Sequence, residues 1–567
     1  SLAIDNHWPM PFLKGVFMLI DKKDGIPDFV TLGRKHLKIV HRNLPTPLLY
    51  EHIIKNREGQ ISHMGPAVVR TGDFAERPLT DKFFVKEVAS EGKVPESYQT
   101  SSLSEAQFER LQHRLLSYMQ NKEVYVQYSY AGRNLDYRTS FRFITETAWH
   151  NLFVRNMFRP IDDVENFEIY DPDFTVVHIP GFRAIPEVDG TGSSAFVIVS
   201  LAQKTAFICG SHYCGEIRQV VFTILNYLLP LNAVFPMRCS ANIGPDGDVA
   251  IFMGRSGTGK TTLAVDSQRR LIGDHAHGWS DQGIVNFERG SYARVLNLSR
   301  EEEPQIFACT QKFGTILENV SIDLETRRVD LNDDALTDNT RAVYPDSHIP
   351  YNFVEGAADH PKNIFLLTCD AMGVMPPIAR LSPELAVYAF LSGYTSRFSD
   401  TAPDPVETDI RFDNCFGQTA LTLPADVYGN LLMEKIKKFN VTCWLINTGW
   451  LGEPRGVGAR INIAQTRKLI HAAVSGQLDS AGYETDPIFS FEIPNECPGV
   501  PASILNPRKM AGNQGEYELR AVQLAKKFKE GFSRYESKMP DNMRTMLLDV
   551  LSLDDSFDML EEFNFSI

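Results

Sequence analysis

A short apolar strand followed at once by a phosphate-binding loop constrains this chain more than any other feature. Val249–Met253 are all apolar, and the next residues, Gly254–Thr261, fit G-x-x-x-x-G-K-[ST] at every fixed position. A buried strand that runs into a Gly-rich loop and then a helix is the unit that binds nucleotide phosphates. The sequence therefore predicts an α/β domain with a nucleotide site at the end of this strand.

Each part of the loop has a chemical role. Glycines allow backbone amides to curl round phosphate oxygens, and the helix that follows points its positive end at the same anion. Lys260 supplies a cation for the β- and γ-oxygens, and the Thr261 hydroxyl is a ligand for Mg²⁺. We expect ATP with Mg²⁺, for which Mn²⁺ can substitute. The expected loop contacts are Gly254, Ser256, Gly257, Thr258, Gly259, Lys260, Thr261 and Thr262.

A carboxylate follows a second apolar run. Leu271 and Ile272 lead through Gly273 to Asp274, which is where a second metal-organising residue belongs in phosphoryl-transfer enzymes. Asp274 is predicted to hold the metal with Thr261, or to act as general base toward an acceptor hydroxyl. The alternative is that it only caps a turn.

Length and local patterns indicate the organisation of the chain. With 567 residues, two large domains are expected. We place them at 1–233 and 234–510, followed by a helical extension, 511–567, whose tail is acidic. Pro95–Ser104 is expected to be a loop. Helices are predicted at Glu105–Asn121 and 214–229, and strands at Val124–Tyr130, Phe174–Ile179, Ala195–Leu201, Asn363–Thr368 and Thr442–Asn447.

Composition narrows the partners. The 57 basic and 71 acidic residues give a net charge of −14, which argues against nucleic acid. The 8 cysteines include no CxxC pair, which favours reduced thiols over a zinc ribbon or a disulfide framework. The apolar stretches Pro11–Ile20 and Val220–Val234 are too short or too interrupted to span a bilayer. We expect a cytoplasmic protein, a monomer or small homo-oligomer, that binds no membrane.

Further motifs carry a family resemblance. Together with the loop they resemble the ATP-dependent phosphoenolpyruvate carboxykinase family over roughly residues 40–510. The resemblance implies an α/β fold with two domains, a mononucleotide-binding C-terminal domain and an active-site cleft between the domains. The motifs are Asn226–Pro230, Cys239–Asn242, Ile272–Trp279, Asn339–Arg341, Asp370–Pro377 and Asn447–Trp450.

Much of the family's site carries over to this sequence. Lys260, Thr261 and Asp274 match the loop lysine and the metal-binding positions, and Arg341 matches the arginine that approaches the transferred phosphate. Other matches are the nucleotide-side residues Glu288, Arg460 and Thr466, and on the substrate side Arg77, which grips the organic acid's carboxylate, with Tyr213 beside it.

The family's second cation site is altered. The resemblance implies a Mn²⁺ held by a Lys, a His and an Asp, but this chain has Gln219, Arg238 and His275 at those positions. An amide oxygen is still a possible ligand, whereas guanidinium stays protonated and carries only donors. These replacements favour loss of the carboxykinase reaction.

The same changes predict a different acceptor. Arg77, Arg218 and Arg238 would line a pocket for an anion, with Tyr213 and Gln219 as further substrate contacts. Our leading hypothesis is an ATP-dependent kinase for a small anionic, hydroxyl-bearing acceptor, such as an inositol phosphate or a sugar phosphate. Its catalytic residues would be Lys260, Asp274, His275 and Arg341.

Three alternatives stay open on the sequence. The first is that the chain is a genuine ATP-dependent carboxykinase that forms phosphoenolpyruvate, CO₂ and ADP from oxaloacetate and ATP. The second is that it is a protein kinase resembling HPr kinase, which shares this type of loop. The third is that it is a nucleotide-binding pseudoenzyme. The intact phosphate-transfer residues argue against this: Lys260, Thr261, Asp274 and Arg341.

Overall fold

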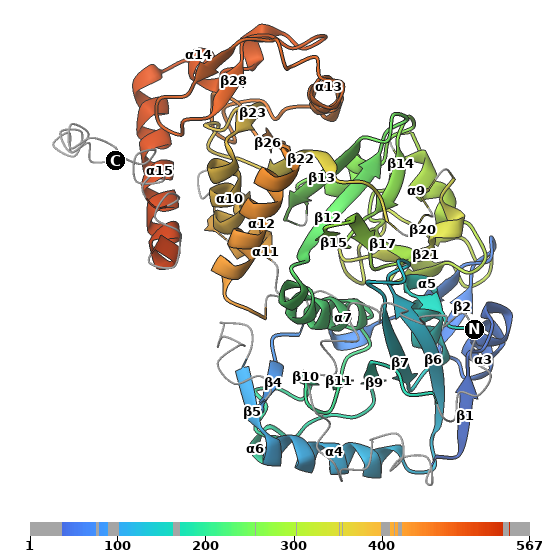
Figure 1. Cartoon of the computed structure of the whole chain (residues 1–567). Coiled ribbons are helices and arrows are strands. Elements are labelled where there is room, and N and C mark those ends of the chain that lie inside the picture. Colours follow the sequence, from blue (N-terminus) through green and yellow to red (C-terminus); the bar gives the residue numbers. More distant parts are fainter. Residues whose placement is uncertain are drawn as a thin grey trace, which may run out of the picture.

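The computed structural model describes most of the chain (Figure 1). The described residues are 37–74, 79–88, 101–162, 170–255, 257–301, 303–350, 352–353, 355, 357–397, 409–412, 414–417, 422–536 and 544. The predictions at Arg77, at Ser256 and in the acidic tail lie outside them.

The N-terminal half is built on a large mixed sheet. Its strand order is β1-β6-β7-β9-β11-β10-β4-β5, and β8 pairs with β6. The strands are β1 (Ile39–Arg42), β4 (Lys82–Lys86), β5 (Ser101–Ser104), β6 (Glu123–Ala131), β7 (Thr139–Thr145), β8 (Arg159–Pro160), β9 (Phe174–Ile179), β10 (Phe196–Ser200) and β11 (Thr205–Cys209).

A second large sheet carries the predicted loop. Its order is β16-β15-β12-β13-β22-β26-β23-β28-β27, and β14 pairs with β12. β13 is buried along its whole length and lies parallel to β22, so the loop follows a central strand. The strands are β12 (Phe235–Ile243), β13 (Val249–Gly254), β14 (Arg270–Gly273), β15 (Ala276–Ser280), β16 (Gly283–Asn286), β22 (Pro361–Thr368), β23 (Ile378–Leu381), β26 (Thr442–Asn447), β27 (Tyr483–Thr485) and β28 (Glu492–Pro494).

A smaller sheet joins segments that are far apart in the sequence. Its order is β17-β21-β18-β3-β2, so strands from both sides of residue 234 pair with each other. The strands are β2 (Gly59–Ile61), β3 (Ala67–Val69), β17 (Gly290–Arg294), β18 (Ile316–Glu318) and β21 (Arg341–Pro345). Two short ribbons complete the described strands: β19 (Ser321–Ile322) with β20 (Val329–Asp330), and β24 (Tyr394–Arg397) with β25 (Asp409–Phe412).

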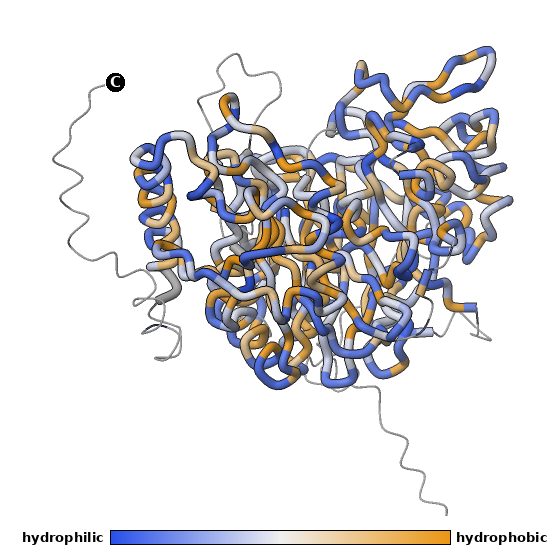
Figure 2. Tube along the Cα trace, turned by 90° about the horizontal axis from the view of Figure 1, so that it is seen from above, coloured by the Kyte–Doolittle hydropathy of each residue, from blue (hydrophilic) through white to orange (hydrophobic). Residues whose placement is uncertain are grey.

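Helices cover and connect these sheets. In Figure 1, α4 and α6 lie along the N-terminal sheet, and α7 lies between the two large sheets. In Figure 2, apolar residues are most frequent toward the interior of the molecule, and polar residues are most frequent at its edges. The helices are α3 (Thr46–Lys55), α4 (Glu105–Met119), α5 (Ala148–Met157), α6 (Pro186–Asp189), α7 (Gly215–Leu228), α8 (Lys260–Ala264), α9 (Pro304–Cys309), α10 (Pro383–Ser392), α11 (Asn414–Gly417), α12 (Ala425–Phe439), α13 (Ile463–Val474), α14 (Pro507–Met510) and α15 (Gln514–Glu536).

Local sequence explains helix α4. Ser104 caps its N-terminus: the Ser104 side chain accepts from the Gln107 amide, and the Gln107 side chain accepts from the Ser104 amide. Phe108, Leu111 and Leu115 recur at helical spacing and are buried. The predicted helix at this place is confirmed, with an end two residues earlier than expected.

One local prediction is wrong and the others hold closely. Ser101–Ser104, expected to be loop, form β5, because they pair in parallel with β4, which the local sequence does not encode. The predicted helix at 214–229 and all the predicted strands are found, within a few residues at each end. Among the described residues, no helix combines the length and the apolar character needed to cross a membrane.

Candidate functional site

The phosphate loop has the conformation that its glycines predict. Gly257 and Gly259 have φ of +88° and +93°, which L side chains rarely adopt. A Cβ on Gly254 would lie 2.6 Å from Thr258 Oγ1 and 2.8 Å from the Leu367 carbonyl oxygen. The loop backbone is therefore closed tightly at its base and is free to turn its amides toward an anion.

Lys260, the first residue of α8, curls back over its own loop. Its Nζ donates to the Gly254 and Arg255 carbonyl oxygens, at 2.7 Å each. Burial, together with the neighbouring charge of Arg238, lowers the pKa of Lys260 to about 7. The ammonium is thus held where bound phosphate would stabilise its charged form.

Asp274 lies against the loop, as predicted. Thr261 Oγ1 and Ser240 Oγ both donate to Asp274 Oδ1, at 2.7 Å each. Burial raises the pKa of Asp274, against the opposing effects of Arg218 and the two hydroxyls. Thr261 and Asp274 present the two oxygen ligands that Mg²⁺ needs from a protein when nucleotide phosphates and water complete its shell. These residues fit Mg²⁺–ATP.

Behind Asp274, a buried arginine meets a buried carboxylate. Arg218 Nε and one terminal nitrogen donate to the Glu288 oxygens, at 2.6 and 2.8 Å. Burial favours the neutral acid, yet Arg218 and His275 outweigh it and hold the pKa of Glu288 well below its usual range. Glu288, expected on the nucleotide side, thus lies on Arg218 and His275.

His275 is neutral in this setting. Burial and Arg218 lower the pKa of His275 to about 3. Its Nδ1 lies 3.1 Å from Glu288 Oε1, and because that carboxylate is ionised, the imidazole proton belongs on Nδ1. An orienting role for His275 toward substrate remains a prediction.

Arg238 lies on β12, opposite Ala276 of β15. Burial lowers the pKa of Arg238 to about 10, and Arg218, Arg341 and Arg255 add to this effect. The structure therefore brings Arg218, Arg238 and Arg341 into one cationic cluster beside the loop. Of the arginines predicted to converge, Arg218 and Arg238 do lie close together, and Arg77 lies outside the described part of the chain. Arg341 joins them, which was not predicted.

Tyr292, which the sequence reading missed, separates two of the arginines. The guanidinium carbons of Arg218 and Arg341 lie 5.9 and 5.4 Å from the centre of its ring. Its hydroxyl donates to Glu318, whose pKa is raised to about 7 by burial. The ring centre of Tyr213 lies 6.2 Å from that of Tyr292.

Gln219 has its amide oxygen engaged. Lys82 Nζ donates to Gln219 Oε1 at 2.7 Å and lies 2.9 Å from Glu216 Oε2. Lys82 was not predicted as part of the site. The substrate-binding role predicted for Gln219 stays a prediction.

The remaining nucleotide-side residues lie in helices α8 and α13 and in the loop before α13. Arg460 Nε donates to the Thr448 carbonyl oxygen at 2.9 Å, and its guanidinium carbon is 5.6 Å from the Trp450 ring. Thr466 is buried on α13, and Thr262 Oγ1 donates to Glu303 at 3.1 Å. Ser256 lies outside the described residues.

The second cation site of the resembled family does not fit the residues present. Among the described residues no group of three His, Cys, Asp or Glu side chains is arranged to hold a metal ion. At the three altered positions, the Gln219 oxygen already accepts a hydrogen bond from the Lys82 ammonium. Arg238 has only hydrogen-bond donors, and the His275 ring faces Glu288.

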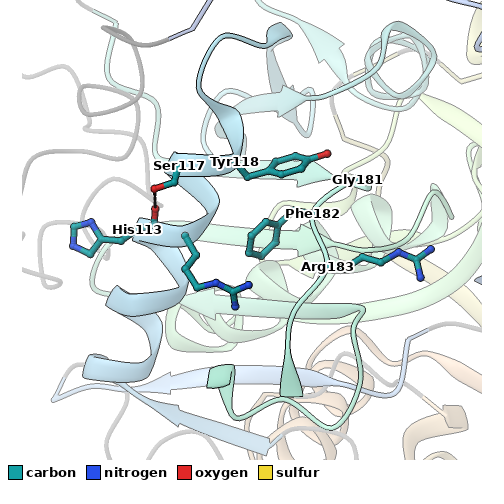
Figure 3. Close-up of a pocket in the computed structure, with 7 residues that line it drawn as sticks. His113, Ser117, Tyr118, Gly181, Phe182 and Arg183 are labelled. Atoms are coloured by element: carbon teal, nitrogen blue, oxygen red, sulfur yellow. Dashed lines mark hydrogen bonds between the residues drawn. The ribbon is translucent and has the colours of Figure 1, made fainter. Parts of the chain in front are cut away.

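A separate pocket of about 480 Å³ lies on the N-terminal sheet, between α4 and the loop at 181–183 (Figure 3). Its charged side chains are paired within the protein: Arg114 with Asp189, and Arg183 with Asp73 at 3.0 Å. The pocket shares no residue with the loop cluster, so we place the candidate site at the loop.

Comparisons with known proteins show the family to which the chain is similar. A family model described as phosphoenolpyruvate carboxykinase matches residues 38–503. A protein of Pelobacter propionicus named phosphoenolpyruvate carboxykinase (ATP) is 48% identical over 505 residues, which cover 89% of this chain and 95% of the relative. A protein of the same name from Geobacter metallireducens is 46% identical over 506 residues (89% and 95%), and one from Thermus thermophilus is 46% identical over 509 residues (89% and 96%).

These relatives correct the main functional hypothesis. A kinase for a phosphorylated polyol is contradicted by relatives that are all named carboxykinase, and loss of the carboxykinase reaction finds no support in them. The inference was wrong because a guanidinium fork binds carboxylate and phosphate alike, so an arginine-lined pocket does not identify its anion.

Proposed function

Because this chain belongs to the ATP-dependent phosphoenolpyruvate carboxykinase family, we propose that it converts oxaloacetate and ATP into phosphoenolpyruvate, CO₂ and ADP. In this reaction the bond to the departing carboxylate breaks, and its electron pair forms an enolate. The enolate oxygen then bonds to the γ-phosphorus of ATP while the bond to ADP breaks.

The observation that carries the proposal is the hydrogen bond from Thr261 to Asp274, beside Lys260 on a closed phosphate loop. Mg²⁺ bound at Thr261 and Asp274 would neutralise the charge of the β- and γ-phosphates. Ser240 donates a second hydrogen bond to the same Asp274 oxygen, Oδ1. This arrangement supports ATP-dependent phosphoryl transfer.

The cationic cluster supplies the rest of the chemistry. Lys260 and Arg341 neutralise the γ-phosphoryl group in transit, and Arg218 and Arg238 face the organic anion. Such charge-assisted hydrogen bonds are strongest where water is excluded, and Arg218 is almost fully buried, with 8% of its surface exposed. In this proposal, positively charged side chains stabilise both the γ-phosphoryl group and the organic anion.

The test is formation of phosphoenolpyruvate from oxaloacetate and Mg²⁺–ATP by the purified chain, followed by ³¹P NMR. We expect phosphoenolpyruvate and ADP to appear together, and Lys260→Met to lower the rate by about 10²–10³-fold. Arg183→Gln, which removes an arginine of the separate pocket, is the control and should leave the rate unchanged. ATP consumed without phosphoenolpyruvate, or no phosphoenolpyruvate either with Mg²⁺ alone or with Mn²⁺ added, would refute the proposal.

A further inference from the structure

We propose that the substrate half of this site binds its dicarboxylate through guanidinium groups and holds no second divalent cation. The cation that accompanies ATP, at Thr261 and Asp274, is then the only divalent ion the reaction needs. The identity of the dicarboxylate rests on the proposed function, whereas the absence of a second cation site rests on the geometry of this chain.

The first argument comes from Gln219. Its carbonyl oxygen is the only atom of the side chain able to ligate a metal, and it accepts a hydrogen bond from Lys82 Nζ at 2.7 Å. Lys82 is itself anchored 2.9 Å from the buried Glu216 carboxylate. An ammonium therefore already lies at the oxygen that a divalent cation would have to share, and the two charges repel each other.

The second argument comes from Arg238. A guanidinium has five N–H donors and no acceptor, and it does not deprotonate in proteins. Arg238 is placed on the central strand β12, in register with Ala276 next to His275. It lies near enough to Arg218, Arg341 and Arg255 for their charges to act on it. A further divalent charge at this position would meet a cluster of positive groups.

The third argument comes from the Glu288 carboxylate. Both Glu288 oxygens are engaged by Arg218, at 2.6 and 2.8 Å, and one also faces His275. Glu288 would have to abandon a buried bidentate pair in order to bind a metal, which leaves a buried charge uncompensated. One imidazole nitrogen of His275 beside guanidinium groups does not make a divalent site.

The arginines replace what the cation would contribute. A guanidinium donates two parallel hydrogen bonds to a carboxylate and stabilises the negative oxygen of an enolate by the same charge-assisted bonds. Glu288 holds Arg218 in one orientation, so little further side-chain conformational entropy is lost when substrate binds. Arg238 lies on β12 opposite Ala276, close enough to Arg218 and Arg341 for their charges to act on it, and is the group we assign to the substrate anion.

The first test measures metal binding alone. Mn²⁺ is titrated into the nucleotide-free protein, and the EPR signal of the free ion reports how much is bound. We expect no stoichiometric site that survives Thr261→Ala. The variant that combines Gln219→Lys, Arg238→His and His275→Asp should gain one bound Mn²⁺ per chain. A stoichiometric site in the wild type that persists in Thr261→Ala would overturn the proposal.

The second test measures anion binding without metal. Oxalate, a planar dicarboxylate that resembles the enolate, is titrated by calorimetry in the presence of EDTA. We expect binding in the wild type, a loss of at least about tenfold in Arg238→Met, and partial retention in Arg238→Lys. Arg183→Gln is the matched arginine control and should bind normally. Oxalate binding that requires added Mn²⁺ would refute the proposal even if the Arg238 variants failed to fold.

These outcomes separate the inference from the proposed function. Oxalate bound in EDTA by a protein that forms no phosphoenolpyruvate would sink the function and leave the guanidinium site standing. Phosphoenolpyruvate formed only when two Mn²⁺ are bound per chain would sink the inference and leave the function standing.

Discussion

Arg218 and Glu288 form a bidentate ion pair in the interior of the protein, with N–O distances of 2.6 and 2.8 Å. Arg218 comes from α7, between the two large sheets, and Glu288 from the turn between β16 and β17. The pair fixes a guanidinium beside the phosphate loop and ties the second sheet to the helix that leads into it. It is therefore a structural device as well as part of the site.

Breaking this pair on one side should be costly. Glu288→Gln leaves the Arg218 charge buried without its counterion, and we expect a loss of about 3–5 kcal/mol in the free energy of unfolding. The double variant Arg218→Met with Glu288→Leu removes both charges and should lose clearly less. Urea unfolding of the three proteins measures this, and equal losses in the single and double variants would contradict the account.

The Asp274 carboxylate should depend on Ser240. Ser240→Ala removes one of the two hydroxyls bonded to Oδ1, and loosening of a residue that positions a metal ligand typically costs 10–100-fold in metal affinity. We expect the Mg²⁺ concentration for half-maximal ATP binding to rise by about tenfold or more. Ser280→Ala, at a buried serine whose hydroxyl donates to the Gly283 carbonyl oxygen, is the control. Matching Mg²⁺ curves for the two variants would show that Ser240 has no positioning role.

The tight base of the loop predicts the effect of a single methyl group. Gly254→Ala places a Cβ within 2.8 Å of the Leu367 carbonyl oxygen, which belongs to backbone and cannot swing away. We expect the thermal stabilisation by ATP to be lost. Gly531→Ala, inside α15 with its nearest neighbour atom at 3.7 Å, is the matched change and should raise stability by roughly 0.5–1 kcal/mol. Normal ATP protection of the Gly254→Ala protein would refute the loop geometry.

Glu318 should make stability depend on pH. Burial raises its pKa from 4.5 to about 7, so between these values the folded state binds more protons than the unfolded state. Its stabilising contribution is complete below about pH 4.5 and decreases as the pH rises to 7. Glu318→Gln removes this titration, so its stability relative to wild type should increase by roughly 3 kcal/mol between pH 4.5 and 8. Urea midpoints that stay a constant distance apart across this range would contradict the raised pKa.

Local features of the sequence predicted the loop and its strand because both are encoded by neighbouring residues. Val249–Met253 is apolar throughout and lies in the sheet centre, and Gly257 and Gly259 take the positive φ that their lack of a side chain permits. The order of the motifs also placed Asp274 against Thr261. These contacts span only 13 residues of sequence.

Contacts between segments that are far apart in the chain could not be predicted from the sequence. Lys82 reaches Gln219 across 137 positions, and Arg218 reaches Glu288 across 70. Neither pair has a local signature, so the partners of Gln219 and Glu288 could not be predicted. β5 was missed for a similar reason, because Ser101–Ser104 has a single apolar residue and becomes a strand only through β4.

Carboxykinase activity that needs no divalent cation besides the one bound with the nucleotide can be tested directly. The most direct measurement is the initial rate of phosphoenolpyruvate formation from oxaloacetate at saturating Mg²⁺–ATP, with Mn²⁺ added in steps from zero. We predict a full rate with Mg²⁺ alone and no activation by Mn²⁺. A rate that is negligible without Mn²⁺ and rises to saturation as Mn²⁺ is added would contradict the account.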